Sequence, residues 1–191
     1  MRVIAGEFRG RRLISPDNYD IRPTSDKVKE AVFSMLYPYI DSETVFVDVF
    51  SGSGGMGLEA ISRGVRRAYF SDQSRDSVRL IRDNIRLCRA EEKSVVLAGD
   101  FRSNISRIHE KADVFFVDPP YADGFILPAV DAILDSDKLA EGGLIVCEHD
   151  KHEQLPEEYR GLTAVKDRRY GKTGITVYAR AEYASSEADK E

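Results

Sequence analysis

From residue 45 onward, short apolar runs alternate with longer amphipathic segments along the chain. Short apolar runs bounded by turn residues are typical of buried strands, and apolar residues that recur every three or four positions are typical of helices. Alternation of the two favours right-handed βαβ units, so the sequence predicts an α/β fold with a doubly wound, mostly parallel sheet and helices on both faces. The predicted strands are 45–50, 67–71, 94–97, 113–117 and 144–148, and the predicted helices lie near 55–63, 74–89, 101–109 and 125–135.

Both ends of the chain depart from this alternation. Stretches 161–166 and 174–180 are rich in β-forming residues with no helix between them, which predicts an antiparallel C-terminal hairpin on the sheet edge. Residues 3–13 contain two apolar stretches around glycines, which predicts a small N-terminal hairpin. A helix should follow, capped by Thr24 or Ser25 and ended by Pro38.

These features predict three parts of unequal size. Residues 1–40 would form an N-terminal hairpin-and-helix extension, residues 41–180 the main domain, and residues 181–191 a disordered acidic tail. At 191 residues, the chain is long enough for one domain with a substantial hydrophobic core.

Charge and cysteine content narrow the class of protein. The net charge of −5 argues against wholesale coating of nucleic acid, although basic residues cluster in residues 1–12 and 164–180. Cys88 and Cys147 lie far apart in apolar stretches and are expected to be free thiols in a reducing compartment. Without a leader-like segment or an apolar run approaching about 18 residues, we expect a cytoplasmic protein that does not bind membranes.

Aspartates close four successive predicted strands: Asp48, Asp72, Asp100 and Asp118. In an open parallel sheet, ligands bind in the crevice beyond the carboxyl ends of the strands. One such aspartate alone is most often a helix cap or a solvated turn residue. Four of them in order predict a single ligand-binding crevice.

A glycine-rich loop follows the first strand, matches the pattern G-x-G-x-x-G, and contains Gly52, Ser53, Gly54 and Gly57. Asp72, about twenty residues on, could bind a ribose diol in either a nicotinamide enzyme or an S-adenosylmethionine (SAM) enzyme. Asp48 precedes the glycines, where its charge suits the ammonium of a methionine moiety better than a diphosphate. The loop therefore favours SAM, and Asp100 beside Phe101 is expected to accept a hydrogen bond from its adenine amino group.

The fourth strand runs into Asp118-Pro119-Pro120-Tyr121. Proline lacks an N–H donor, so the strand must stop at Asp118. The Asp118 carboxylate and the Pro119 carbonyl can both accept hydrogen bonds from one NH2 group while Tyr121 stacks on the attached ring. The alternative is a plain strand stop with a surface tyrosine. The position of this motif beside the other strand-end acids favours the interpretation as a clamp for an amino group.

In this order, the motifs resemble those of class I SAM-dependent amino-methyltransferases. Three further segments resemble the RsmD family: R-V-I-A-G-E-F-R-G-R at 2–11, R-P-T-S-D-K-V-K-E-A at 22–31 and R-Y-G-K-T at 169–173. The similarity runs from residue 2 to about residue 180. The resemblance implies a Rossmann-like class I methyltransferase fold and methylation of the exocyclic N2 amino group of one guanine in small-subunit (16S) ribosomal RNA.

The resemblance also implies roles for the predicted site residues. The loop 48–57 and Asp72 would hold the methionine and ribose parts of SAM, Asp100 would hold the adenine, and residues 118–121 would place the target amino group. Catalysis is then expected to rest on positioning, without a covalent intermediate or a metal ion. His149 and His152, next to Glu148 and Asp150, superficially resemble metal ligands, but they lack a fitting further pair.

A base must leave its stack to reach a pocket at a sheet edge, so basic residues are expected to hold the surrounding phosphates. For each of them, a solvated surface charge is the ordinary alternative. The candidates for contacts with 16S rRNA, free or in an assembling small subunit, are Arg9, Arg11, Arg12, Arg22, Lys27, Arg169 and Lys172. A single modest domain gives no reason to expect more than a monomer.

Rival activities stay open at this point. Adenine-N6 and cytosine-N4 methyltransferases of DNA or RNA share the D-P-P-Y motif. A nicotinamide-binding oxidoreductase and a SAM-binding RNA adaptor without turnover are alternatives from other classes. Titration with SAM and with NAD distinguishes the oxidoreductase, and methyl transfer to subunits, naked rRNA and DNA distinguishes the others.

Overall fold

The computed structural model describes residues 1–15, 25–120 and 124–183. It confirms the predicted α/β alternation. The strands are β1 (Val45–Asp48), β2 (Arg67–Asp72), β3 (Ser94–Ala98), β4 (Ala112–Val117), β5 (Leu139–Asp150), β6 (Glu158–Tyr159), β7 (Leu162–Tyr170) and β8 (Thr173–Arg180). The helices are α1 (Asp26–Leu36), α2 (Gly55–Ser62), α3 (Arg75–Cys88), α4 (Phe101–Ser106) and α5 (Ile126–Asp135), with short 3-10 turns at Tyr37–Tyr39 and Glu91–Lys93.

The strands form one sheet in the order β3-β2-β1-β4-β5-β8-β7-β6. Strands β1 to β5 pair in parallel, whereas β8 pairs antiparallel with both β5 and β7. The predicted C-terminal hairpin is thus confirmed at the β5 edge. Because the chain winds outward from β1 to β3 and then returns to β4 on the other side of β1, a crevice opens beyond the carboxyl ends of β1 and β4.

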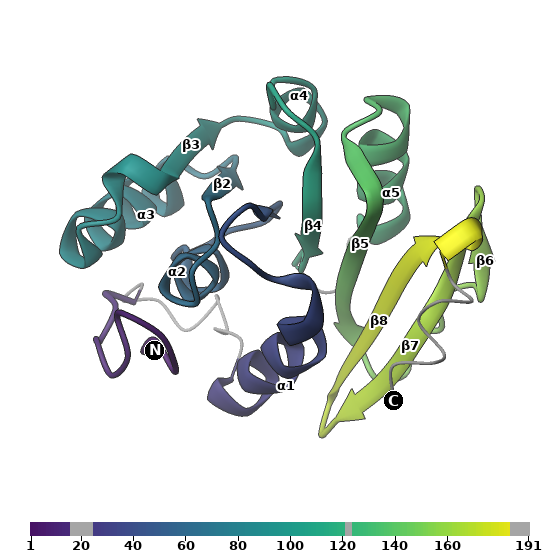
Figure 1. Cartoon of the computed structure of the whole chain (residues 1–191), viewed down its shortest axis with the longest axis horizontal. Coiled ribbons are helices and arrows are strands. Elements are labelled where there is room, and N and C mark those ends of the chain that lie inside the picture. Colours follow the sequence, from purple (N-terminus) through teal and green to yellow (C-terminus); the bar gives the residue numbers. More distant parts are fainter. Residues whose placement is uncertain (16–24, 121–123, 184–191) are drawn as a thin grey trace.

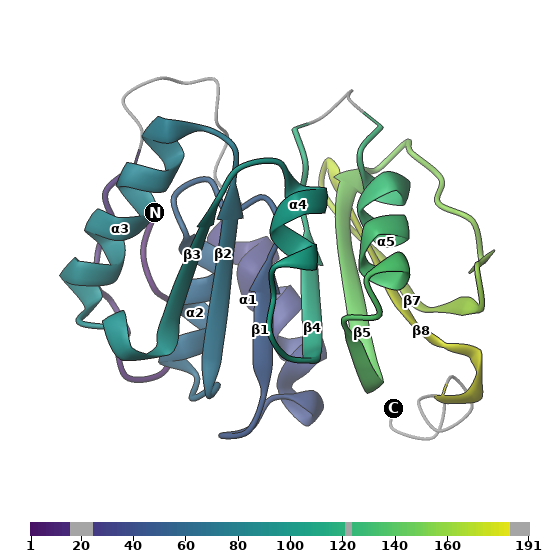
Figure 2. The same ribbon diagram turned by 90° about the horizontal axis from the view of Figure 1, so that it is seen from above.

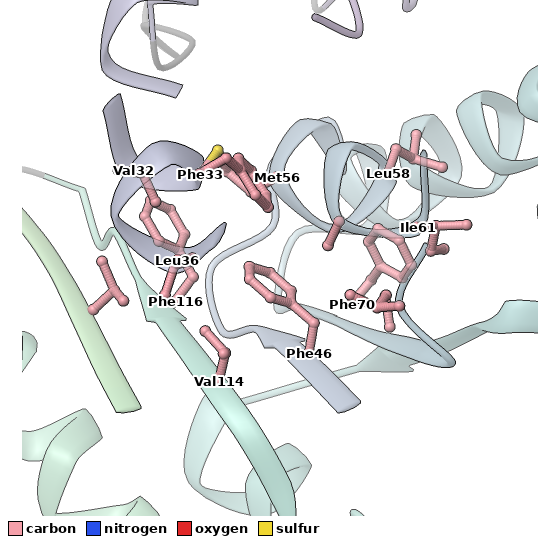
Figure 3. Close-up of a cluster of buried hydrophobic side chains, with 14 of the residues drawn as sticks. Val32, Phe33, Leu36, Phe46, Met56, Leu58, Ile61, Phe70, Val114 and Phe116 are labelled. Carbon is pink, nitrogen blue, oxygen red and sulfur yellow. The ribbon is translucent and has the colours of Figure 1, made fainter. Parts of the chain in front are cut away.

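Helices cover both faces of the sheet (Figure 1). Helices α1, α2 and α3 pack on one face, and α4 and α5 pack on the other. Figure 3 shows the first core, in which the rings of Phe33 from α1 and Phe46 from β1 stack with centroids 6.0 Å apart. Figure 2 shows the strands side by side between the two helical layers. Both cores hold the strand ends rigidly, so side chains at the carboxyl edge have fixed positions.

Helix α1 begins at the predicted cap. The Ser25 hydroxyl accepts a hydrogen bond from the Val28 amide at 3.3 Å, and Pro38 lies in the 3-10 turn that follows the helix. Arg22 and Thr24, which the sequence also singled out, lie outside the described residues.

The N-terminal segment forms a short antiparallel hairpin around an isolated bridge between Arg2 and Arg12. Backbone hydrogen bonds flank this bridge, from the Leu13 amide to the Met1 carbonyl at 3.1 Å and from the Val3 amide to the Arg11 carbonyl at 3.0 Å. Beyond residue 3, the amides of residues 4 and 5 donate instead to the carboxylate of Glu59 in α2, at 2.7 and 3.0 Å. The hairpin is therefore short and is bound to α2.

Several predicted boundaries also change. β5 begins at Leu139 instead of residue 144, because Leu139 already pairs with Ala112 of β4. The register then shifts before Leu144, and Gly142, with a φ of 70°, lies in this irregular stretch. Residues 181–183 form a helical turn rather than part of the predicted disordered tail, and the rest of that tail lies outside the described residues. Cys88 and Cys147 are buried free thiols, as predicted. No helix in the described ranges is both long and apolar enough to cross a membrane.

Candidate functional site

The strand-end acids line one pocket of about 630 Å³ at the carboxyl edge of the sheet. This volume falls within the range of roughly 300 to 1,000 Å³ that is usual for small-molecule sites. Two of the acids end β1 and β2, one caps α4 after β3, and one follows β4 directly. The predicted site residues that line the pocket are Asp48, Gly52, Ser53, Asp72, Asp100, Phe101, Asp118 and Pro119. Tyr121 lies outside the described residues.

Glycine is required at different positions of the loop for different structural reasons. Gly54 has a φ of 81° and is the N-cap of α2, a conformation that L side chains rarely adopt. A side chain at Gly57 would start 2.3 Å from the ring of Phe70, so this glycine allows α2 to approach β2. Neither residue lines the pocket, whereas Gly52 does. Gly54 and Gly57 therefore shape the loop from behind.

Asp48 is a buried acid at the floor of the pocket. Its carboxylate accepts a hydrogen bond from the Gly57 amide at 3.3 Å. Burial, with a smaller contribution from the nearby charge of Asp72, raises the pKa of Asp48 from 3.8 to about 7, although the Gly57 amide and Lys29 act in the opposite direction. Burial disfavours the charged form of a carboxylate, and a bound cation favours it. A cationic ligand is therefore attracted more strongly by a buried carboxylate than by a solvated one.

Asp72 joins the loop to the end of β2. Its two oxygens accept hydrogen bonds from the Gly52 amide at 2.9 Å and the Ser74 amide at 2.8 Å. Burial raises the pKa of this carboxyl group. The two amide bonds orient the carboxylate at the pocket wall, where its remaining lone pairs can accept from hydroxyl groups.

Asp100 serves as a helix cap, which is the ordinary alternative noted for a lone aspartate. Its side chain accepts a hydrogen bond from the Arg102 amide at 2.9 Å at the start of α4. The Arg102 guanidinium lies 4.4 Å from the ring centroid of Phe101 and 3.5 Å from Asp100. Capping occupies one carboxylate oxygen, and the residue still lines the pocket.

An aromatic wall beside Asp100 was not predicted. The ring centroids of Phe50 and Phe101 are 5.2 Å apart, and that of Phe125 lies 6.5 Å from Phe50 and 5.9 Å from Phe101. All three residues line the pocket and can cover a planar ring. Phe50 and Phe125 are far apart in the chain, so only the fold brings them together.

Lys29 in α1 is a second unpredicted member of the pocket lining. Its side chain is fully buried, and its Nζ donates to the Arg2 carbonyl at 2.9 Å and lies 3.9 Å from Glu59 Oε2. Burial lowers the pKa of this lysine. The helical pattern around it marks Val28, Val32 and Leu36 as core residues and carries no signal for a buried cation.

The basic candidates lie at two different edges. Arg169 and Lys172 are exposed beside the β7–β8 turn, which lies at the carboxyl edge because Thr173 pairs with Asp150 at the end of β5. Arg11 donates from Nη1 to the Leu87 carbonyl at 2.8 Å, near the end of α3. Since α3 begins at the carboxyl edge and spans 14 residues, that end is about 20 Å away from the pocket side.

The other basic candidates within the described residues are also exposed. Arg9 lies in the same turn region as Arg11, Arg12 forms a backbone bridge with Arg2, and Lys27 lies in the first turn of α1. Strand register places Arg169 and Lys172 at the pocket edge.

His149 has structural partners for both ring nitrogens. Nδ1 donates to the Asp150 carbonyl at 2.9 Å, and Nε2 lies within hydrogen-bond distance, 2.9 Å, of the Thr176 hydroxyl. Among the described residues, no group of three His, Cys, Asp or Glu side chains is arranged to hold a metal ion.

Comparison with known proteins places the chain among methyltransferases. The family model described as conserved hypothetical protein 95 matches residues 1–179. A putative rRNA methyltransferase, YlbH of Bacillus subtilis, is 34% identical over 181 residues, covering 93% of this chain and 98% of the relative. Ribosomal RNA small subunit methyltransferase D of Escherichia coli is 30% identical over 189 residues, covering 99% and 94%.

Solved structures with the same fold are also methyltransferases. The putative methyltransferase yhhF from Escherichia coli superposes with a TM-score of 0.83 at 29% identity, covering 94% of this chain and 97% of that one. Class I methyltransferases such as these use SAM as the methyl donor. The family model, the curated relatives and the shared fold show that the chain belongs to the RsmD family of class I methyltransferases.

Proposed function

We propose that this protein methylates the exocyclic N2 amino group of a guanine in 16S ribosomal RNA, using SAM. The observation that carries the proposal is the single pocket in which the strand-end acids meet the Asp118-Pro119 turn. Relatives named small subunit methyltransferase D, at 30% identity over nearly the whole chain, support rRNA as the substrate class. We further propose that the protein acts in the cytoplasm as a monomer.

The donor set of the pocket fits SAM. Asp48 is a buried carboxylate for the ammonium group, Asp72 is an oriented acceptor for ribose hydroxyls, and the wall of Phe50, Phe101 and Phe125 can cover an adenine. When bound, SAM supplies a methyl group already activated by a sulfonium leaving group. We assign Gly52, Ser53, Gly54 and Gly57 to the loop that shapes this subsite, and Asp100 to its adenine end.

Asp118 and Pro119 hold the acceptor in this proposal. A guanine amino lone pair is delocalised into the ring, so it is a poor nucleophile. Two acceptors on the NH2 group, the Asp118 carboxylate and the Pro119 carbonyl, stabilise the positive charge that grows on nitrogen and favour the pyramidal geometry that exposes the lone pair. Tyr121 stacks on the base, and Asp118 or water takes the departing proton.

The basic residues provide contacts to phosphates around an extruded nucleotide. Arg169 and Lys172 are best situated for this, since they are exposed at the same sheet edge as the pocket. Arg9, Arg11 and Arg12 are assigned to a more distant part of the RNA footprint, and Arg22 and Lys27 are further proposed contacts to phosphates. Their charges act on encounter and orientation rather than on the reacting base.

The proposal predicts which nucleic acids the protein methylates. With radiolabelled SAM, the protein should label 16S rRNA that lacks the modification, as small subunits or as naked rRNA, and leave DNA unlabelled. Digestion to nucleosides should yield N2-methylguanosine. Label in N6-methyladenine or N4-methylcytosine, or equal labelling of DNA, would replace the proposed acceptor with that of the related amino-methyltransferases.

The raised pKa of Asp48 predicts a pH-dependent affinity for the demethylated cofactor, S-adenosylhomocysteine. Its ammonium binds the ionised carboxylate, and with a pKa of about 7 the ionised fraction of Asp48 rises about tenfold from pH 6 to pH 8. The Kd from calorimetry should therefore be about tenfold weaker at pH 6. Methylthioadenosine, which lacks the amino acid part, should bind with little pH dependence, and so should either ligand to Asp48→Asn.

The same group affects the stability of the free protein. Because folding raises the pKa of Asp48, its favourable contribution to stability is complete below pH 3.8 and is lost as the pH rises through about 7. Asp48→Asn should therefore raise the free energy of unfolding more at pH 8 than at pH 5 in urea titrations. An equal change at both pH values would show that Asp48 ionises normally in the folded protein.

A further inference from the structure

A second carboxylate lies beside the acceptor turn. In the parallel pairing of β4 with β5, Phe116 pairs with Val146 and Val117 with Cys147. The next residues along the two strands are Asp118 and Glu148, so these residues are level on neighbouring strands, which lie about 4.8 Å apart.

Both acids point to the same face of the sheet. Side chains alternate along a strand, and the preceding residues of the same parity, Phe116 in β4 and Val146 in β5, belong to the core under α1 and α2. The antiparallel partner of Glu148 in β8, Ile175, belongs to that core as well. Apart from Asp118, these neighbours of Glu148 on this face of the sheet are therefore apolar.

Glu148 is 3% exposed. Burying a carboxylate among such neighbours costs free energy that an apolar residue would avoid. Its neighbour His149 points to the opposite face, where the Thr176 hydroxyl and the Asp150 carbonyl each lie 2.9 Å from a ring nitrogen.

The surroundings of Glu148 connect it to the acceptor rather than to the cofactor. Glu148 lines a small hollow beside the main pocket rather than the main pocket itself. Pro119, Pro120 and Phe125 line both, and His149 and Glu153 also line the hollow. The glycine loop contributes nothing to the hollow among the residues described. A base held by Asp118 and Pro119 would therefore have Glu148 on its flank.

The bases differ in what they present there. On guanine, the ring N1–H lies next to the exocyclic NH2, so two adjacent positions donate hydrogen bonds. On adenine and cytosine, the ring nitrogen next to the amino group is an acceptor with a lone pair. A carboxylate beside the amino clamp accepts from guanine N1–H and repels the lone pair of the other two bases.

We propose that Glu148 determines the choice of guanine by accepting a hydrogen bond from its N1–H while Asp118 and Pro119 hold the N2 amino group. The inference rests on the proposed methylation of guanine N2 and deepens it, because the D-P-P-Y turn alone fits any planar amino group. A site that accepts a hydrogen bond from an N–H of the substrate discriminates strongly against a base that lacks this N–H.

The test uses base analogues in the natural substrate. The modified guanine is first located in small subunits labelled by the wild-type protein. Subunits are then reconstituted with 2-aminopurine at that position, which keeps the 2-amino group but has a lone pair at N1. Wild-type protein should methylate 2-aminopurine at least tenfold less efficiently than guanine, as kcat/KM. Equal efficiencies would overturn the inference without using any variant.

Glu148→Gln provides the matched change. Its amide can donate to the N1 lone pair, so the preference for guanine over 2-aminopurine should fall about tenfold or more, while calorimetric affinity for S-adenosylhomocysteine is unchanged. Glu158→Gln, on the exposed strand β6, should keep the wild-type preference. An unchanged preference in Glu148→Gln would overturn the role of Glu148 even if wild-type protein makes N2-methylguanosine. Absence of N2-methylguanosine from every wild-type reaction would instead overturn the proposed function.

Discussion

Replacing Asp118 with alanine should lower methyl transfer to small subunits by about 100- to 1,000-fold, which is the usual effect of removing one preorganised group that stabilises developing charge. The carboxylate acts on the acceptor nitrogen, and the buried acid for the cofactor ammonium is Asp48 instead. Affinity for S-adenosylhomocysteine should therefore stay within about twofold of the wild-type value. Single-turnover rates and calorimetry measure the two effects separately.

Two further variants sharpen this prediction. Asp118→Asn keeps one oxygen acceptor without the charge, so its rate should fall between the wild-type and alanine values. Asp137→Asn makes the same chemical change where the carboxylate is exposed and paired with Lys111, and its rate should be unchanged. Near-wild-type turnover of Asp118→Ala would remove Asp118 from the reaction, and a parallel loss of cofactor binding would reassign it to the cofactor subsite.

Strand-end positions were predictable because their signal is local. An apolar run followed by an aspartate marks both a strand and its carboxyl end, and the parallel topology then requires Asp48, Asp72 and Asp118 to meet at one edge. The cap at Asp100 was also visible in principle, since an aspartate before a helical segment is a common N-cap. Capping and the proposed contact with adenine are compatible, since the residue also lines the pocket.

Contacts between distant segments were not predictable from periodicity. Glu148 reads as the polar end of a strand, and only the pairing of β5 with β4 and β8 shows that it lies buried beside Asp118. The contact of the N-terminal hairpin with α2 was not predictable for a similar reason. The apolar residues at 3–13 carry no information about a carboxylate 55 residues away that accepts from the amide of Ile4.

That carboxylate, Glu59, joins three parts of the molecule. Its side chain is fully buried in α2, and it accepts hydrogen bonds from the Ile4 amide at 2.7 Å and the Ala5 amide at 3.0 Å. It also pairs with Arg63 at 2.8 Å and lies 3.9 Å from the buried Lys29 of α1. The N-terminal segment, α1 and α2 are thus held around one charge under the cofactor loop.

Glu59→Ala should therefore lower the free energy of unfolding by about 3 to 5 kcal/mol, because it removes the carboxylate beside the buried Lys29 and leaves two partly buried amides without this acceptor. For a chain of this size, the melting temperature should fall by about 6 to 20 °C. Glu30→Ala, at an exposed position of α1, should change the free energy of unfolding by less than about 0.5 kcal/mol. Urea denaturation measures both, and amide exchange at Ile4 and Ala5 should accelerate only in the Glu59 variant. A loss below about 1 kcal/mol would mean that the N-terminal segment is held by its apolar contacts, with the buried charge cluster contributing little.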